Sequence, residues 1–131
     1  MLVTDIEGKK TSWILRGEEV GQDSRARSDL HITARQLLKL RFPTHQLLEE
    51  VPFKPHSWVT LYLDFYLPLR KLAVEVHGQQ HYKYSSLFHT SRSVFLKQLR
   101  NDDDKIEWCN LNGITLVILP YDTVPTWKDL L

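Results

Sequence analysis

The stretch from Leu61 to His77 decides the fold, and it reads Leu-Tyr-Leu-Asp-Phe-Tyr-Leu-Pro-Leu-Arg-Lys-Leu-Ala-Val-Glu-Val-His. Two runs rich in aliphatic and aromatic residues, 61–67 and 72–77, flank a short connection that begins with Pro68. Such runs, separated by a tight connection, predict two neighbouring antiparallel strands. We therefore expect a β-hairpin at the centre of the chain.

Each of these two predicted strands carries a carboxylate among apolar neighbours. Side chains alternate between the faces of a strand, so Glu75 and His77 share one face, beside the flexible Gly78. Asp64 lies inside the other run, where a carboxylate is costly to bury unless it is paired or binds a metal ion. If the hairpin register brings Asp64 beside Glu75, the two like charges need a cation to neutralise them.

A buried ion pair is the alternative interpretation of these carboxylates. A lysine or arginine, such as Lys71 or Arg100, would then neutralise Asp64 or Glu75 without any metal ion. An Asp on one strand and a Glu-x-His on the next nevertheless favour a metal site, because hard oxygen ligands are those that Mg²⁺ prefers.

The sequence around the hairpin predicts an α/β fold, with a central mixed β-sheet flanked by helices. Ser28 or Asp29 can cap a helix that ends near Phe42, and Gly113 stands where the C-cap of a helix over 91–112 is expected. The other predicted elements are short strands in 1–6 and 11–16, a loop over 21–27, strands over 46–53 and 114–119, and a helical stub around Trp127.

The composition indicates one intracellular domain. The chain has 131 residues, of which 42% are hydrophobic and 25% charged, so it can form a core, and no apolar run is long enough to cross a membrane. We expect an N-terminal extension (1–27), a core (28–121) and a C-terminal stub (122–131). The single cysteine, Cys109, excludes an internal disulfide and suits the cytoplasm.

The predicted long helix places one aspartate on its apolar side. The apolar stripe consists of Phe95, Leu99, Ile106 and Cys109, and Asp102 falls in the middle of it. We expect Asp102 to face inward as a functional group, whereas Asp103 and Asp104 rotate into solvent. His77, next to the carboxylates, suits a general base or a residue that orients metal-bound water, whereas His81 taken alone would be structural.

The charge distribution favours a polyanionic partner, although the net charge of +1 argues against one. No Asp or Glu occurs from Val76 to Asn101. Basic side chains alternate there with aromatic ones, which is typical of a channel for nucleic acid, and a solvated surface is the alternative. The basic residues of this stretch are Lys83, Arg92, Lys97 and Arg100, the aromatic ones include Tyr82, Tyr84, Phe88 and Phe95, and a second basic run contains Arg25, Arg27, Arg35, Lys39 and Arg41.

These motifs resemble the PD-(D/E)XK nuclease superfamily, in the branch of the very-short-patch-repair endonucleases and the small phage-encoded homing endonucleases. The resemblance covers residues 28–121. Its carriers are Leu63-Asp64-Phe65-Tyr66, the run from Leu72 to Tyr82 that includes Glu75-Val76-His77-Gly78-Gln79-Gln80-His81, Asp102 with Lys105, and Trp108 to Ile114. The resemblance implies a single-domain, restriction-endonuclease-like fold.

The resemblance also implies roles for individual residues. Asp64 and Glu75 would be acidic ligands of Mg²⁺, which Mn²⁺ could replace, and the backbone carbonyl of Val76 would complete the protein ligands. His77 takes the place of the superfamily lysine. In the repair-type branch, His81 and Asp102 would assist water activation. Glu50 matches a further acidic position, and Glu49 is a near miss on the opposite face of its strand.

We therefore expect a metal-dependent endonuclease acting on double-stranded DNA, with a phage-type homing endonuclease as the first choice. Lys83, Arg92, Lys97, Arg100 and Arg35 are its expected DNA contacts, and a homodimer would supply the two active sites that a double-strand cut needs. A mismatch- or junction-specific repair nickase of the same fold is one alternative. A DNA-binding module that keeps the fold without catalysis is the other.

Overall fold

A mixed five-stranded sheet forms the centre of the protein, in the strand order β3-β4-β5-β6-β7. The computed structural model describes residues 1–19, 27–85, 89 and 91–131. The strands are β3 (Glu18–Glu19), β4 (Leu48–His56), β5 (Val59–Leu67), β6 (Leu72–His77) and β7 (Thr115–Pro120). Neighbouring strands from β3 to β6 are antiparallel, whereas β7 runs parallel to β6. The predicted mixed sheet and the central hairpin of β5 and β6 are confirmed.

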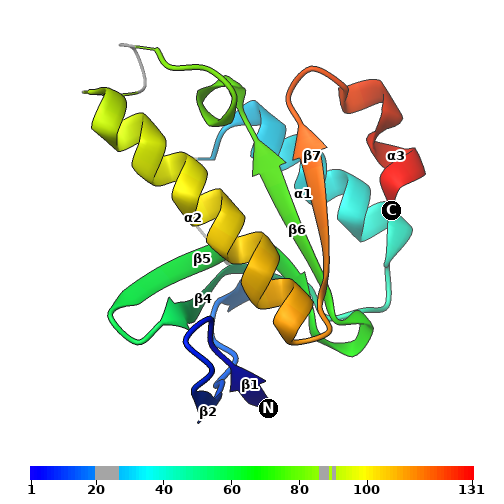
Figure 1. Cartoon of the computed structure of the whole chain (residues 1–131). Helices are drawn as coiled ribbons and strands as arrows, with labels where there is room; N and C mark the ends of the chain where they lie inside the picture. Colours follow the sequence, from blue (N-terminus) through cyan, green and yellow to red (C-terminus); the bar gives the residue numbers. More distant parts are fainter. Residues whose placement is uncertain (20–26, 86–88, 90) are drawn as a thin grey trace.

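Helices cover both faces of this sheet (Figure 1). Helix α2 (Arg92–Leu111) contributes Trp108 and Cys109 to one apolar core. Helices α1 (Asp29–Arg41) and α3 (Trp127–Leu130) lie on the other side, where Leu38 and Trp127 belong to a second core. The expected α/β layering is therefore confirmed.

Polar caps fix where the two long helices begin, as the sequence predicts for the first. Ser28 accepts a hydrogen bond from the backbone N–H of His31, and Ser91 accepts one from Val94. Gly113 follows α2 with a φ of 65°, the left-handed conformation that favours glycine after a helix. Short 3₁₀ turns follow β5 (Pro68–Arg70, η1), β6 (Gln79–His81, η2) and β7 (Val124–Thr126, η3).

The N-terminal residues that the structure describes pack against the central sheet. Strands β1 (Leu2–Thr4) and β2 (Lys10–Ser12) form a small hairpin. Trp13 follows it into the core, where its ring lies edge-on to Trp108 at 4.9 Å and its indole N–H donates to the carbonyl of Pro52 at 2.9 Å. Most of the loop expected over 21–27 lies outside the described residues.

Strand β4 is longer than predicted and forms a hairpin with β5. The sequence predicts a strand over 46–53, whereas β4 continues through Pro55 to His56. Strand β3 pairs only with Leu48 and Glu49, so the remainder of β4 is a sheet edge on which a missing N–H is tolerated. The hairpin turn is therefore at residues 57–58, between the paired residues His56 and Val59.

The prediction is wrong for one residue of the apolar stripe of α2. Ile106 is 39% exposed, whereas Trp108 and Cys109 are buried, because the sheet contacts a helix face rotated away from Ile106. Asp103 is exposed as expected, but Asp104 is half-buried against His56. Cys109 is free and buried. Among the residues described, no helix combines the length and the apolar character that a membrane span requires.

Candidate active site

The central hairpin opens at the position of the two predicted carboxylates. The β5–β6 pairing ends at Phe65 and Val74. One residue beyond, the backbone N–H of Asp64 donates to Glu75 Oε2 at 2.8 Å, and the backbone N–H of Val76 donates to Asp64 Oδ2 at 2.8 Å. Side-chain carboxylates thus replace the backbone partners where the two strands separate. The predicted proximity of Asp64 and Glu75 is confirmed.

A lysine of α2 neutralises part of this acidic pair. Lys105 donates to Glu75 Oε1, and Glu75 itself is only 2% exposed. A buried ion pair is therefore present, as the alternative interpretation proposed, but its cation is neither Lys71 nor Arg100. The resemblance includes Lys105 without giving it a role. Lys105 follows Asp102 by three residues, and residues i and i+3 share a helix face. This spacing was the signal by which the sequence could have placed Lys105 in the site.

The protonation properties of the site reflect burial and charge. Burial, followed by the charge of Glu75, raises the pKa of Asp64 to about 7, although the Val76 N–H and Lys105 oppose the change. Burial alone would lower the pKa of Lys105, but the carboxylates of Glu75, Asp64 and Asp102 together raise it. Two carboxylates and one ammonium leave the centre with an excess of negative charge when all three are ionised.

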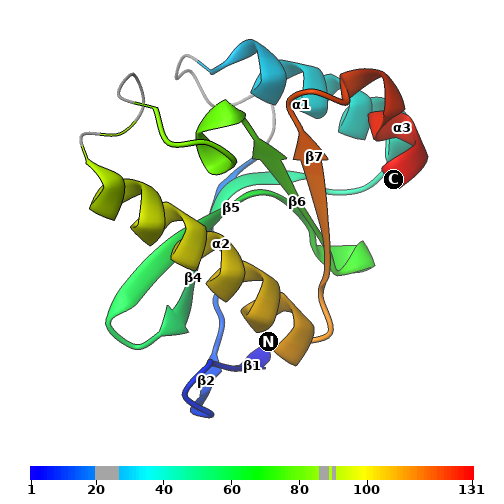
Figure 2. The same cartoon turned by 45° about the horizontal axis from the view of Figure 1, so that its top comes forward.

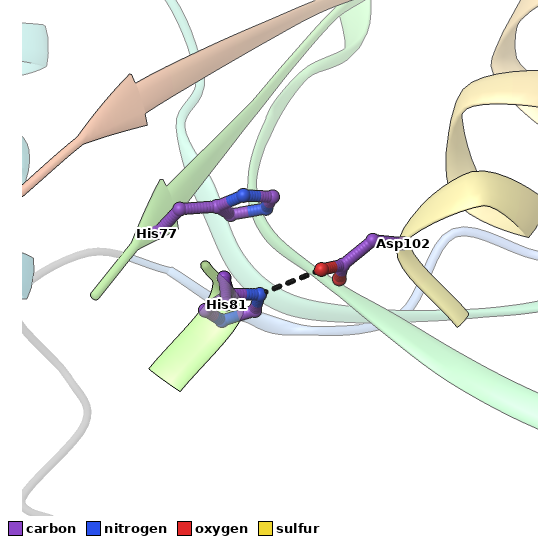
Figure 3. Close-up of side chains that lie close together, drawn as sticks. All are labelled: His77, His81 and Asp102. Carbon is purple, nitrogen blue, oxygen red and sulfur yellow. Dashed lines mark hydrogen bonds and ion pairs between the residues drawn. The ribbon is translucent and has the colours of Figure 1, made fainter. Parts of the chain in front are cut away.

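A histidine–carboxylate pair stands beside this centre. His81 Nδ1 lies 2.8 Å from Asp102 Oδ2, and the His77 ring stacks on the His81 ring with a centroid distance of 4.0 Å and an interplanar angle of 9° (Figure 3). The other ring nitrogen of His81, Nε2, lies 3.3 Å from Gln98 Nε2. If Nδ1 carries the proton toward Asp102, the single lone pair of Nε2 accepts from the Gln98 amide, and both side chains line the pocket described below.

His77 is the buried member of this group. It is 6% exposed, and burial, followed by the neighbouring charge of His81, lowers its pKa to about 4. Ligand atoms of His77, His81 and Asp102 lie within 4.8 Å of one another. The lone pairs of imidazole lie in the ring plane, so two parallel stacked rings direct them side by side rather than toward one ion. The arrangement suits proton transfer better than chelation.

One pocket of about 740 Å³ joins the acidic centre to the histidine–carboxylate pair. Its lining includes six of the residues discussed above: Asp64, Glu75, Val76, His81, Asp102 and Lys105. His77 and Glu50 are not among the residues that line it. The pocket therefore brings together both predicted acidic ligands and the His81–Asp102 pair. His77 lies behind His81 and does not line the pocket.

The two neighbouring glutamates of β4 lie outside the pocket lining. Glu50 has a φ of 53°, and at this residue the usual alternation of side chains is interrupted. Glu49 is fully buried against α1, where it accepts hydrogen bonds from Arg35 and lies 3.0 Å from His31 Nε2. Glu50 pairs with Arg27 at 3.0 Å. The structure therefore does not bring Glu50 into the site that the resemblance suggested.

The predicted DNA contacts are distributed unevenly. Lys97 and Arg100 line a hollow next to the main pocket. Arg92 lies over the Tyr84 ring at 5.0 Å, and Lys83 is exposed. The guanidinium of Arg35 instead donates to Glu49 at 2.8 and 3.2 Å, and it is committed to this buried carboxylate. Arg25 and Phe88, which belong to the predicted basic and aromatic stretches, lie outside the described residues.

Comparison with known proteins shows relatives among viral proteins. The chain is 41% identical over 69 residues to "Uncharacterized protein 307L" of Invertebrate iridescent virus 6, which covers 51% of the chain and 35% of that protein. It is 34% identical over 67 residues to "Uncharacterized protein 033L" of Invertebrate iridescent virus 3, covering 51% of the chain and 34% of that protein. It is also 39% identical over 77 residues to "Uncharacterized protein 094L" of Frog virus 3 (isolate Goorha), covering 58% of the chain and 47% of that protein.

The chain thus spans between a third and a half of the length of these relatives. No family model and no solved structure matches it. The printed names of the relatives describe no activity. A function for this chain must therefore be argued from the geometry of its own pocket.

Proposed function

We propose that this chain is a metal-dependent endonuclease that hydrolyses phosphodiester bonds in DNA. The observation that supports the proposal most directly is the meeting of Asp64 and Glu75 where β5 and β6 separate, with Lys105 and the His81–Asp102 pair in the same pocket. Acidic oxygens, a fixed ammonium and an oriented imidazole are the groups that phosphodiester hydrolysis uses.

The donor atoms of this centre fit a hard divalent cation. Asp64 and Glu75 offer carboxylate oxygens, each with lone pairs beyond those used by the backbone N–H groups. The raised pKa of Asp64 reflects a buried carboxylate beside a second one, an arrangement that a cation would relieve. Mg²⁺, with Mn²⁺ as a substitute, would be held by Asp64, Glu75 and the backbone carbonyl of Val76. When bound, it would polarise the phosphoryl oxygen and make water more acidic.

His81 is the residue that we assign to proton transfer. Asp102 fixes its ring through Nδ1, and Nε2 would accept a proton from an attacking water that takes the place of the Gln98 amide. Because its pKa of about 4 keeps His77 neutral and weakly basic, His77 positions the ring of His81 by stacking rather than acting as the base. Lys105 lines the pocket with its ammonium on Glu75, where it can stabilise negative charge that develops on phosphate.

The more specific function depends on the DNA that is cut. A homing endonuclease, which the resemblance suggests, would cut fully paired plasmid DNA at one sequence, and a homodimer would be needed to cut both strands. A mismatch- or junction-specific nickase would leave such DNA intact and would act as a monomer. A binding module would bind DNA without cutting it.

Replacement of the acidic pair tests the proposal. We expect the purified protein to cut DNA with Mg²⁺ and to stop cutting with EDTA, and we expect Asp64→Asn and Glu75→Gln to abolish cleavage. Asp103→Asn is the matched control, because it removes a carboxylate from the exposed side of α2. Cleavage by both site variants at the rate of the unmodified protein would contradict the assignment, and binding without cleavage under every divalent cation would favour the binding module.

A further inference from the structure

The turn of the β4–β5 hairpin carries the one exposed tryptophan of the four in the chain. Trp58 is 69% exposed, whereas Trp13, Trp108 and Trp127 are exposed by 7% or less. The hairpin reaches past the rest of the sheet, with α2 running alongside it (Figures 1 and 2). This ring belongs to neither apolar core, so its position must be judged by what surrounds it.

The indole of Trp58 is held in a defined orientation. Its ring stacks on the ring of His56 at a centroid distance of 4.8 Å and an angle of 15°. His56 is itself held on both sides, because its Nδ1 lies 2.8 Å from Glu7 Oε1 and its Nε2 lies 3.4 Å from Asp104 Oδ2. One face of the indole is therefore covered and supported, and the exposure of the side chain leaves the other face open.

Two basic side chains, Lys97 and Arg100, line the same hollow as this open ring. Trp58 lines a hollow of about 480 Å³ between the hairpin turn and α2, together with Val94, Lys97 and Arg100. Asp104 also lines the hollow, but its carboxylate lies 3.4 Å from His56 Nε2, so two cations and one carboxylate that has a partner line the hollow. An aromatic face flanked by cations complements a nucleobase followed by its phosphates.

The hollow continues into the proposed active site. Asn101 lines both the hollow and the main pocket, and residues of the β4–β5 hairpin and of α2 contribute to each. Trp58 precedes Asp64 by six residues. At about 3.3 Å per residue, this separates them by roughly 20 Å along the strand, the rise of about six base pairs.

We propose that Trp58 stacks an unpaired nucleobase of the DNA strand, while Lys97 and Arg100 hold the phosphates beside that base. In a paired duplex both faces of a base are already covered by its neighbours, so an open indole gains a partner only where a base is unstacked. The substrate class is then DNA with an unpaired segment, such as a flap or bubble, within about six nucleotides of the bond that is cut. This inference rests on the proposed nuclease function for its placement of the substrate.

Fluorescence tests the inference without catalysis, because Trp58 is the exposed fluorophore. In EDTA, a short oligothymidine should quench the emission more strongly than a fully paired duplex of equal length, and Trp58→Phe should abolish the difference. Trp58→Ala should weaken oligothymidine binding about 5- to 150-fold, as for loss of one stacked base, whereas Trp58→Phe should retain most of the affinity. Leu69→Ala, which shortens an exposed apolar side chain at the far end of β5, is the matched control.

Three outcomes of these binding measurements would overturn the inference. The first is equal quenching by the paired duplex, and the second is an affinity for oligothymidine that Trp58→Ala leaves unchanged. The third is tighter binding of oligouridine than of oligothymidine, which would assign the surface to RNA.

Cleavage assays separate this inference from the proposed function. Stacking by Trp58 with no cleavage under any divalent cation would remove the nuclease proposal and leave the nucleobase site. Cleavage of flap and paired DNA at equal rates, unaffected by Trp58→Ala, would remove the nucleobase site and leave the nuclease. The expected result is preferential cleavage of the flap, lost in Trp58→Ala.

Discussion

Asp64 and Glu75 bind the backbone at the point where their two strands separate: the N–H of Asp64 donates to Glu75, and Asp64 accepts the N–H of Val76, each at 2.8 Å. The two contacts satisfy buried donors that the β5–β6 ladder no longer pairs. The same residues that end the ladder therefore form the acidic centre of the pocket, so the opening of the hairpin and the site have one structural cause.

The contribution of Asp64 to stability should fall as pH rises toward 7, and Asp64→Asn should remove this part of the pH dependence. His77, whose pKa is lowered to about 4, acts in the opposite direction in both proteins, so the comparison with the variant isolates Asp64. Because the pKa of Asp64 is raised from 3.8 to about 7, the folded state binds more protons than the unfolded state between these values. The stability present below pH 4 is lost as pH rises through 7, by at most about 4 kcal/mol. Denaturant unfolding at pH 4 and pH 8 measures it. An identical pH dependence in the variant and the unmodified protein would contradict the burial of Asp64.

Removal of the Lys105 ammonium should have opposite effects on metal binding and on catalysis. Lys105→Met should bind Mn²⁺ more tightly, because a cation no longer competes for Glu75, and it should cut DNA about 10²–10³-fold more slowly. Calorimetry measures the first effect and single-turnover cleavage the second. Lys128→Met, at an exposed lysine of α3, is the control. Unchanged values for both quantities would make Lys105 a purely structural partner of Glu75.

The two stacked histidines should differ in importance. His81→Ala should slow cleavage about 10²–10⁴-fold, as expected for loss of a general base, and Asp102→Asn should lower the rate because the His81 ring loses its orienting carboxylate. His77→Phe keeps a ring beneath His81 and should cost less than about tenfold. Added imidazole should partly restore His81→Ala. The reverse order of effects would identify His77 as the base.

Variants of the two adjacent glutamates of β4 should differ: the change at Glu49 should lower stability, whereas the change at Glu50 should leave stability and cleavage almost unchanged. Glu49→Gln removes the buried partner of Arg35 and should destabilise the fold by about 3–5 kcal/mol, or lower the Tm by roughly 10 °C. Glu50→Gln should cost less than about 1 kcal/mol, because the pair with Arg27 is partly exposed, and it should cut DNA normally. Thermal unfolding and cleavage rates test both. A large loss of cleavage in Glu50→Gln would return Glu50 to the site.

Local patterns were sufficient to predict much of the fold. Alternation of apolar residues identified β6 and the inward side of Glu75, and Ser28 and Gly113 marked the ends of helices through their own backbone preferences. The hairpin from Leu48 to Leu67 was not predicted in full. The predicted strand ended at Phe53, whereas β4 continues through Pro55 to His56, because the missing N–H of a proline is tolerated on an unpaired edge. Whether an edge is paired depends on β3, a strand of two residues that leaves no signal in the sequence.

The sequence by itself determined the acidic pair, the order of the elements and the inward position of Asp102, because each depends on spacing along one strand, hairpin or helix. Only the tertiary structure decided that Lys105 neutralises Glu75 and that His77 lies behind His81. It also decided that Glu49 pairs with Arg35 of α1, and that the exposed Trp58 lines a hollow with Lys97. These relations join elements distant along the chain. Their geometry follows from how two helices pack on a twisted sheet, which periodicity within one segment does not specify.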